Sequence, residues 1–141
     1  MESFYSDADK KIVKADLFDI TAEKIANGFV KDNKGVSGTQ MRRLYDEVKR
    51  FDQNLDGTRE TWDKNYPYIR MIKSKVSYNV ARAIEKNKSE ADVYKNLSAF
   101  IIKYIEMVKD EDDYHVFTAL FEAVYGFFYA KTVAKKLKQE D

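Results

Sequence analysis

The 141 residues include 25 Lys or Arg and 24 Asp or Glu, and this net charge of +1 argues against indiscriminate coating of nucleic acid. The absence of cysteine excludes disulfides, thiolate zinc sites and thiol nucleophiles. A content of 44% hydrophobic residues excludes a disordered chain, and no apolar run approaches the roughly 20 residues of a membrane-spanning helix. We therefore expect one domain over residues 1–141, a cytoplasmic address and no membrane partner.

Apolar residues recur at spacings of three and four, which is typical of amphipathic helices, and no stretch alternates as a strand would. Residues 1–18 lack this pattern and are expected to form a flexible N-terminal segment. A short helix is predicted over 21–31, followed by a longer one over about 38–51. Ser37 and Gln40 have the spacing of a capping box at the start of that longer helix.

Three further helices are predicted after the break at 54–57. Pro67 suits the first turn of the third helix, because the amide that proline lacks is unused there. That helix ends near Asn87, the fourth runs from about 89 to 108, and the fifth follows the acidic turn at 110–113. Short connections between five helices indicate an all-α, single-domain antiparallel bundle.

Basic residues concentrate in the middle of the sequence. Residues 34–88 hold thirteen Lys or Arg against seven Asp or Glu, whereas both flanking segments are net acidic. Projection at 100° per residue places Lys75, Arg82 and Lys86 together on the third helix, beside Tyr78 and Asn79. Arg42 and Arg43 lie on the non-core side of the second helix. These stripes fit a ribose-phosphate backbone, and they equally fit ordinary solvated helix faces.

A calcium loop is the most specific local pattern. Asp52, Asn54, Asp56 and Asp63 occupy positions one, three, five and twelve of a calcium-binding helix-loop-helix, with a glycine at position six. Position twelve is Asp instead of the longer bidentate Glu. An Asp- and Asn-rich turn between two helices explains the same residues without a metal.

Catalytic patterns are missing from the sequence. The single histidine, His115, stands three residues after Asp112, which makes one pair of potential ligands and no complete metal site. No nucleophile elbow, phosphate-binding glycine loop or paired-carboxylate arrangement is present. We therefore predict a protein without enzymatic activity and without a cofactor.

Three segments together resemble the small subunit of the type III-A CRISPR effector, the Csm complex. They are 37–45 (SGTQMRRLY), 73–82 (KSKVSYNVAR) and 117–124 (FTALFEAV), and their order and spacing are similar to that family's. Ala81 departs from the family's pattern, where a glycine precedes the arginine. Tyr129 departs as well, since a basic residue follows the Glu-Ala block in the family.

The resemblance implies a noncatalytic subunit that contacts crRNA and target RNA, binds other Csm subunits and self-associates in several copies along the RNA. Arg42 and Arg82 match arginines of the family, and Lys73 falls where a basic residue is common. Helix projection adds Arg43 and Lys75. The predicted RNA-binding residues are thus Arg42, Arg43, Lys73, Lys75 and Arg82. A calcium-binding module built on residues 52–63 and a helical protein-interaction scaffold remain as alternatives.

Overall fold

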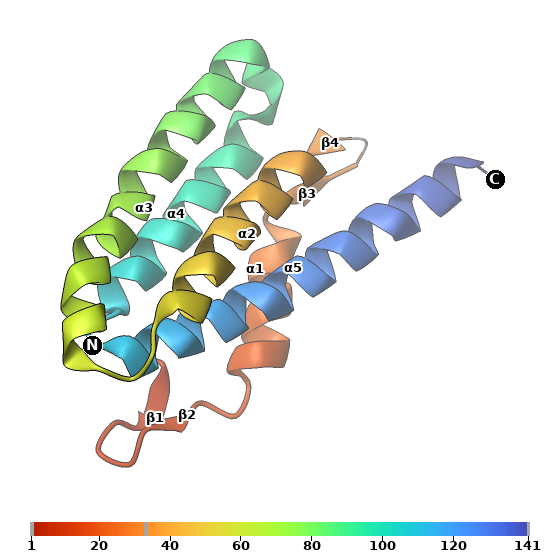
Figure 1. The fold of residues 1–141 in the computed structure, drawn as a ribbon. Helices are drawn as coiled ribbons and strands as arrows, with labels where there is room; N and C mark the ends of the chain where they lie inside the picture. The colour runs from red at the N-terminus through yellow and green to blue at the C-terminus, as the bar shows by residue number, and fades with distance from the viewer. Residues whose placement is uncertain (1, 33, 141) are drawn as a thin grey trace.

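The computed structural model describes residues 2–32 and 34–140, and within them the fold is an all-α bundle, as predicted (Figure 1). The α-helices are α1 (Ala22–Asn27), α2 (Gly38–Asn54), α3 (Arg59–Lys86), α4 (Ala91–Met107) and α5 (Glu111–Glu140). A π-helical turn, η1 (Leu17–Thr21), precedes α1, and a 3-10 turn, η2 (Lys88–Glu90), joins α3 to α4. None of the described helices has the length and apolarity needed to span a bilayer.

Two small hairpins correct the expectation that the chain holds no strands. Strand β1 (Tyr5–Asp7) pairs antiparallel with β2 (Ile12–Val13), and β3 (Val30–Lys31) pairs antiparallel with β4 (Lys34–Gly35). Each strand is two or three residues long, which is too short for an alternating pattern to appear in a sequence. The first hairpin is tied to the bundle, since Phe4 is buried and the Tyr5 hydroxyl donates to Asp113 Oδ1 at 2.7 Å.

Side-chain caps fix where α2 and α3 begin. The Ser37 hydroxyl accepts a hydrogen bond from the Gln40 amide at 3.4 Å, which confirms the predicted start of α2. Thr58 Oγ1 accepts from the Thr61 amide at 3.3 Å at the start of α3. The predicted start of this helix at Pro67 was wrong, because the Thr58 cap and the burial of Trp62 begin it earlier. Pro67 lies inside α3 on its exposed side, where water can solvate the carbonyl that proline leaves without a donor.

The core is centred on a cluster of aromatic rings between α4 and α5. The Phe100 ring lies 5.5 Å from Phe121 and 6.2 Å from Phe117, measured between centroids. Phe29 from the segment after α1 approaches Phe100 at 5.8 Å, so one ring joins three parts of the chain. Separations of this size are the favourable range for aromatic pairs.

Replacement of this central ring should destabilise the whole domain. We expect Phe100→Ala to lower the free energy of unfolding by about 3–5 kcal/mol, through lost burial and the cavity that remains. Urea denaturation followed by circular dichroism measures the difference. Tyr129→Ala is the control, because Tyr129 is 63% exposed on α5 and should change stability by only about 0.5 kcal/mol. Equal losses in the two variants would contradict this account of the core.

Candidate functional site

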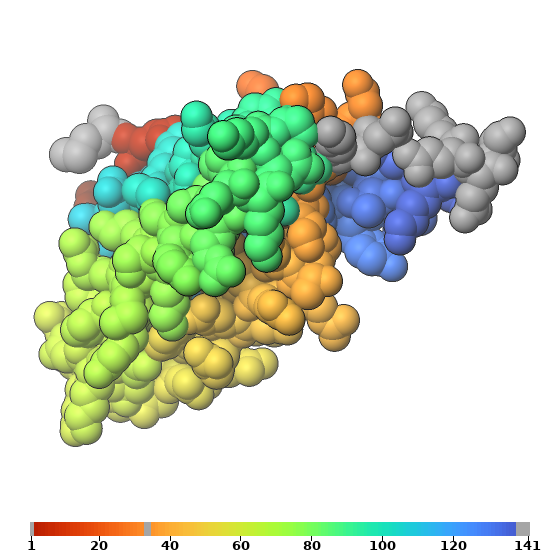
Figure 2. All heavy atoms as spheres, turned by 90° about the horizontal axis from the view of Figure 1, so that it is seen from above, coloured from red at the N-terminus to blue at the C-terminus, as the bar shows by residue number. Residues whose placement is uncertain are grey.

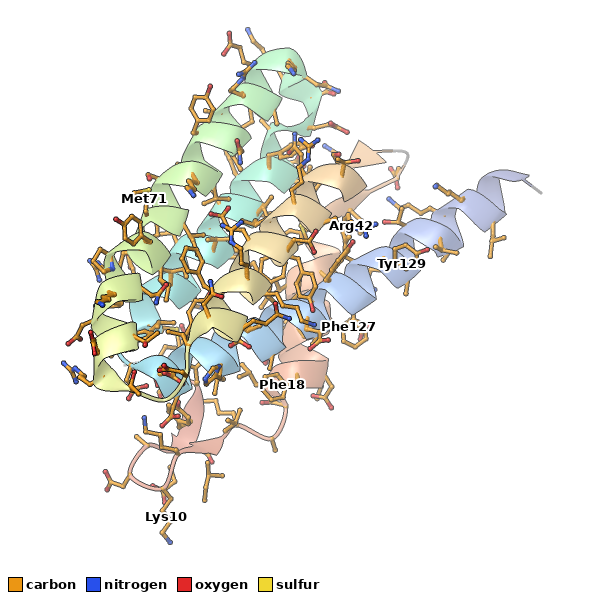
Figure 3. All side chains as sticks on the ribbon, viewed as in Figure 1. Lys10, Phe18, Arg42, Met71, Phe127 and Tyr129 are labelled. Atoms are coloured by element: carbon orange, nitrogen blue, oxygen red, sulfur yellow. The ribbon has the colours of Figure 1, made fainter. Side chains whose placement is uncertain are left out.

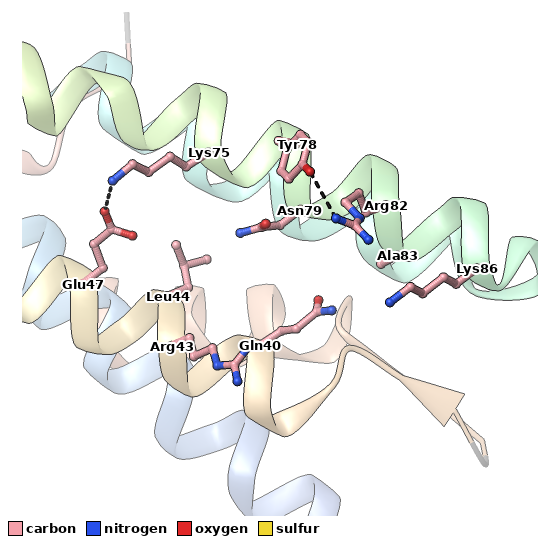
Figure 4. A pocket seen from close by; sticks show the side chains of 10 residues that line it. All are labelled: Gln40, Arg43, Leu44, Glu47, Lys75, Tyr78, Asn79, Arg82, Ala83 and Lys86. Atoms are coloured by element: carbon pink, nitrogen blue, oxygen red, sulfur yellow. Dashed lines mark hydrogen bonds and ion pairs between the residues drawn. The ribbon is translucent and has the colours of Figure 1, made fainter.

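A groove of about 290 Å³ lies between α2 and α3 (Figure 4). In the space-filling view the C-terminal half of α3, in green, stands beside the start of α2, in orange, with a hollow between them (Figure 2). Its lining is drawn from both helices: Gln40, Arg43, Leu44, Glu47, Lys75, Tyr78, Asn79, Arg82, Ala83 and Lys86. Four of these side chains are cationic and one is anionic, so the groove is net positive.

Helical spacing explains how each wall is built. The α2 residues of the groove follow one another by three, one and three positions, which places them on one side of the helix. The α3 residues repeat by three and four over three turns. Leu44 and Ala83 are the buried members, at 9% and 8% exposure, and their neighbours extend outward as polar rims. The core-facing residues of α2 and α3 thereby fix which polar residues meet across the groove.

Two contacts order the charged groups of the groove. Lys75 Nζ forms an ion pair with Glu47 Oε1 at 2.7 Å, across the gap between the helices. Arg82 Nη1 donates to the Tyr78 hydroxyl at 3.1 Å, one turn away on α3. That hydrogen bond raises the pKa of Arg82 above its already high ordinary value, so the guanidinium is always charged. The result is a preorganised cationic surface with one internal counter-charge.

The structure brings together three of the five predicted RNA-binding residues. Arg43, Lys75 and Arg82 line the groove. Arg42 lies on the side of α2 that faces away from α3 in Figure 3, where its guanidinium is 4.0 Å from Asp46 Oδ2. Lys73 reaches toward α4 instead, with its Nζ 3.8 Å from Glu106 Oε1. Two predicted residues therefore stand outside the groove.

Two groove residues were missed by the sequence analysis, namely Gln40 and Glu47. Gln40 was considered only as a capping partner, and Glu47 was not considered. Their spacing from Arg43 and Leu44 was the available signal, since it puts all four on one helical face. Residue spacing does not show, however, that this face of α2 lies opposite α3.

The four candidate calcium ligands do not converge. Helix α2 continues through Asn54 and α3 begins at Arg59, so only four residues of the would-be twelve-residue loop are non-helical. Asp56 Oδ1 accepts from the Thr58 amide at 2.9 Å, and Asp63 Oδ1 accepts from Arg59 Nε at 3.0 Å. Among the described residues no group of three or more His, Cys, Asp or Glu is arranged to hold a metal ion. This geometry favours the interhelical turn over the calcium loop.

His115 joins the end of α2 to the start of α5. Its Nδ1 lies 2.5 Å from Asp52 Oδ1, and its Nε2 lies 2.9 Å from Glu111 Oε2. Glu111 also accepts a hydrogen bond from the Gly57 amide in the turn before α3, at 3.1 Å. Burial alone would lower the pKa of His115, but the hydrogen bonds to the two carboxylates outweigh it and raise the pKa above 6.5. The imidazole and its two carboxylate partners therefore link α2, α5 and the α2–α3 turn.

This link should make stability depend on pH. A histidine whose pKa is raised by folding stabilises the folded state fully below its unfolded pKa, about 6.5, and loses that effect as pH rises through the folded pKa. We expect the wild type to be more stable than His115→Gln at about pH 6 by at most about 1 kcal/mol, since the group is partly exposed. Urea denaturation of both proteins at a series of pH values below and above 6.5 measures the difference in their free energies of unfolding. A gap that stays constant with pH would show that His115 contributes by packing and not by charge.

The fold and the groove define a small helical protein with a cationic groove between two helices. The family model for Csm2 Type III-A matches residues 13–139, and the chain belongs to that family. Neither the search of curated proteins nor the search of solved structures found a match. Membership makes the chain a small subunit of a type III-A CRISPR complex, and the other Csm subunits are its partners.

Proposed function

We propose that this subunit binds the backbones of crRNA and target RNA, and that the α2–α3 groove is the centre of the contact. The observation that carries the proposal is the meeting of Arg43, Lys75, Arg82 and Lys86 in one groove built by two helices. Cationic side chains that project from rigid helices suit phosphates, and they position RNA without reading its sequence. Arg42 and Lys73 lie outside the groove, beside Asp46 and Glu106 respectively, so in this proposal they are separate phosphate contacts and not part of the groove.

The subunit acts without catalysis and in several copies. Among the described residues that line the groove, Glu47 is the one acid, and it is held by Lys75 instead of being free for proton transfer. Each phosphate contact is weak and salt-dependent, so one groove gives low affinity. Copies packed along one RNA in the cytoplasm, with the other Csm subunits, raise the effective concentration of each groove for its phosphates.

An exposed apolar strip on α5 supports the protein–protein part of this proposal. Tyr129, Val133 and Leu137 are spaced by four residues and are 63%, 36% and 59% exposed. In Figure 1 this end of α5 projects away from the other helices. Aromatic and aliphatic side chains on one exposed helix face are typical of surfaces that pack against another protein.

Removal of the groove cations tests the RNA-binding proposal. We expect Arg43→Ala/Lys75→Ala/Arg82→Ala to weaken binding of a labelled RNA on the order of 100-fold, at about 1 kcal/mol for each lost contact. The dependence of log affinity on log salt should also fall, by about 0.7 per lost phosphate contact on a single strand. Fluorescence anisotropy across a salt series measures both quantities.

The control for this variant removes the same charge elsewhere. Lys10, Lys64 and Lys95 are exposed and lie outside the groove, and their triple alanine variant should bind RNA nearly as well as the wild type. Equal losses in the two variants would mean that net charge alone, and not the groove, attracts RNA. In that case the groove would be an ordinary solvated surface.

Glu47 should act against RNA binding. Its carboxylate repels phosphates and holds Lys75, so we expect Glu47→Gln to raise RNA affinity by about fivefold and to increase the salt dependence. Glu60→Gln removes the same charge from an exposed ion pair outside the groove and should have little effect. An unchanged affinity for Glu47→Gln in the same anisotropy assay would separate this ion pair from the RNA site.

A further inference from the structure

The groove contains more than a phosphate site needs. A surface that binds only a backbone requires cations at its rim, yet the floor of this groove is apolar at Leu44 and Ala83. Its volume of about 290 Å³ lies at the lower limit of small-molecule sites, which bind through apolar walls and a few convergent polar groups. The space therefore suits one ring-sized group and not a large ligand.

Two side-chain amides face this space from opposite walls, Gln40 on α2 and Asn79 on α3 (Figure 4). Within residues 2–32 and 34–140, neither amide group makes a hydrogen bond. An amide side chain presents two donor hydrogens and one acceptor oxygen, which is the combination that matches the edge of a nucleobase. Phosphate oxygens only accept hydrogen bonds, so on RNA an amide oxygen accepts from a base edge or from a ribose 2′-hydroxyl and not from a phosphate.

Tyr78 supplies an aromatic face at the rim. Its side chain is 61% exposed, and Arg82 lies over it with the guanidinium carbon 5.8 Å from the ring centroid. The hydrogen bond from Arg82 to the Tyr78 hydroxyl fixes the two side chains relative to each other. An exposed ring held in place is a ready platform for stacking, and an adjacent guanidinium strengthens such contacts.

We infer that the α2–α3 groove holds a single unpaired nucleotide of RNA, which deepens the proposed function and rests on it. The base stacks on Tyr78 above the apolar floor, and its edge meets Gln40 and Asn79. The phosphates on either side of it pair with Arg43, Lys75 and Lys86. A nucleotide inside a continuous duplex has both faces stacked and its edge paired, so it cannot enter. The groove thus selects strand segments with an accessible base.

The test compares three RNAs with the isotopically labelled full chain by nuclear magnetic resonance titration, which detects millimolar affinities. The probes are a single strand, its perfect duplex, and the same duplex with one bulged nucleotide. We expect the single strand and the bulged duplex to shift the resonances of Gln40 and Asn79 and to bind at least fivefold more tightly than the perfect duplex. Tyr78→Ala should remove about tenfold of the affinity for these two RNAs and leave the perfect duplex nearly unchanged.

Two further variants separate stacking from other losses. Tyr78→Phe keeps the ring but loses the hydroxyl that Arg82 contacts, so it should retain most of the single-strand affinity. Tyr68→Ala removes an equally exposed tyrosine, 57% exposed on the same helix but outside the groove, and should change nothing. A Tyr78→Phe variant as weak as Tyr78→Ala would overturn the stacking role.

The outcomes distinguish this inference from the proposed function. If all three RNAs bind equally and Tyr78→Ala weakens none of them selectively, the groove contacts only the backbone and the inference is wrong while the proposed function stands. If no RNA shifts any resonance of the groove residues, both the inference and the proposed function are wrong. Mononucleotides are the fourth probe in the titration. A free nucleotide that binds as tightly as the single strand would show that the groove binds a soluble nucleotide and not an RNA strand.

Discussion

The contact between α4 and α5 around Phe100 is the constraint on which the groove depends. Helix α3 packs along α4 and buries Ile69, Ile72 and Val76, whereas α2 packs mainly on α5. The two walls of the groove are therefore anchored to different helices, and the Phe100 ring cluster holds those helices together. Because α2 and α3 make their strongest contacts elsewhere, the space between their facing sides is not filled by core side chains.

The link between α2 and α5 is reinforced by polar contacts that the groove does not use. Tyr114 is buried on α5, and its hydroxyl donates to the Val48 carbonyl of α2 at 2.8 Å. The ring of Tyr45 lies 5.1 Å from Tyr125, and His115 joins the two helices at their other end through Asp52. A buried hydrogen bond, an aromatic pair and a partly exposed contact between histidine and carboxylate thus act on the same interface. The position of α2, and with it half of the groove, is fixed by groups far along the sequence.

Residue spacing within one helix correctly predicted which side chains share a face. It could not predict which faces of two different helices pack against each other. Met41, Leu44 and Val48 follow one another by three and four positions and are buried, as expected for an amphipathic helix, and the Ser37 cap is where the pattern placed it. Projection likewise placed Lys75, Arg82 and Lys86 together on α3. It gave no means to know that Arg43 faces this stripe while Arg42 does not, because that depends on which helices pack together. Pro67 misled because a proline that removes one hydrogen bond and crowds the preceding turn usually marks a helix end, whereas here the Thr58 cap and the burial of Trp62 start α3 before it.

The groove gathers like charges, and the fold allows this because of where it places them. Four cations around one carboxylate repel one another, yet their side chains extend from the apolar floor at Leu44 and Ala83 toward water, which screens the repulsion. The Lys75–Glu47 pair removes part of the remaining cost, with Glu47 only 20% exposed. Replacement of Glu47 by a neutral residue and binding of a phosphate at Lys75 would therefore both change the balance between attraction and repulsion among the charges of the groove. The groove therefore keeps a net positive charge that the protein does not neutralise, and in the proposed function the RNA backbone supplies the missing negative charge.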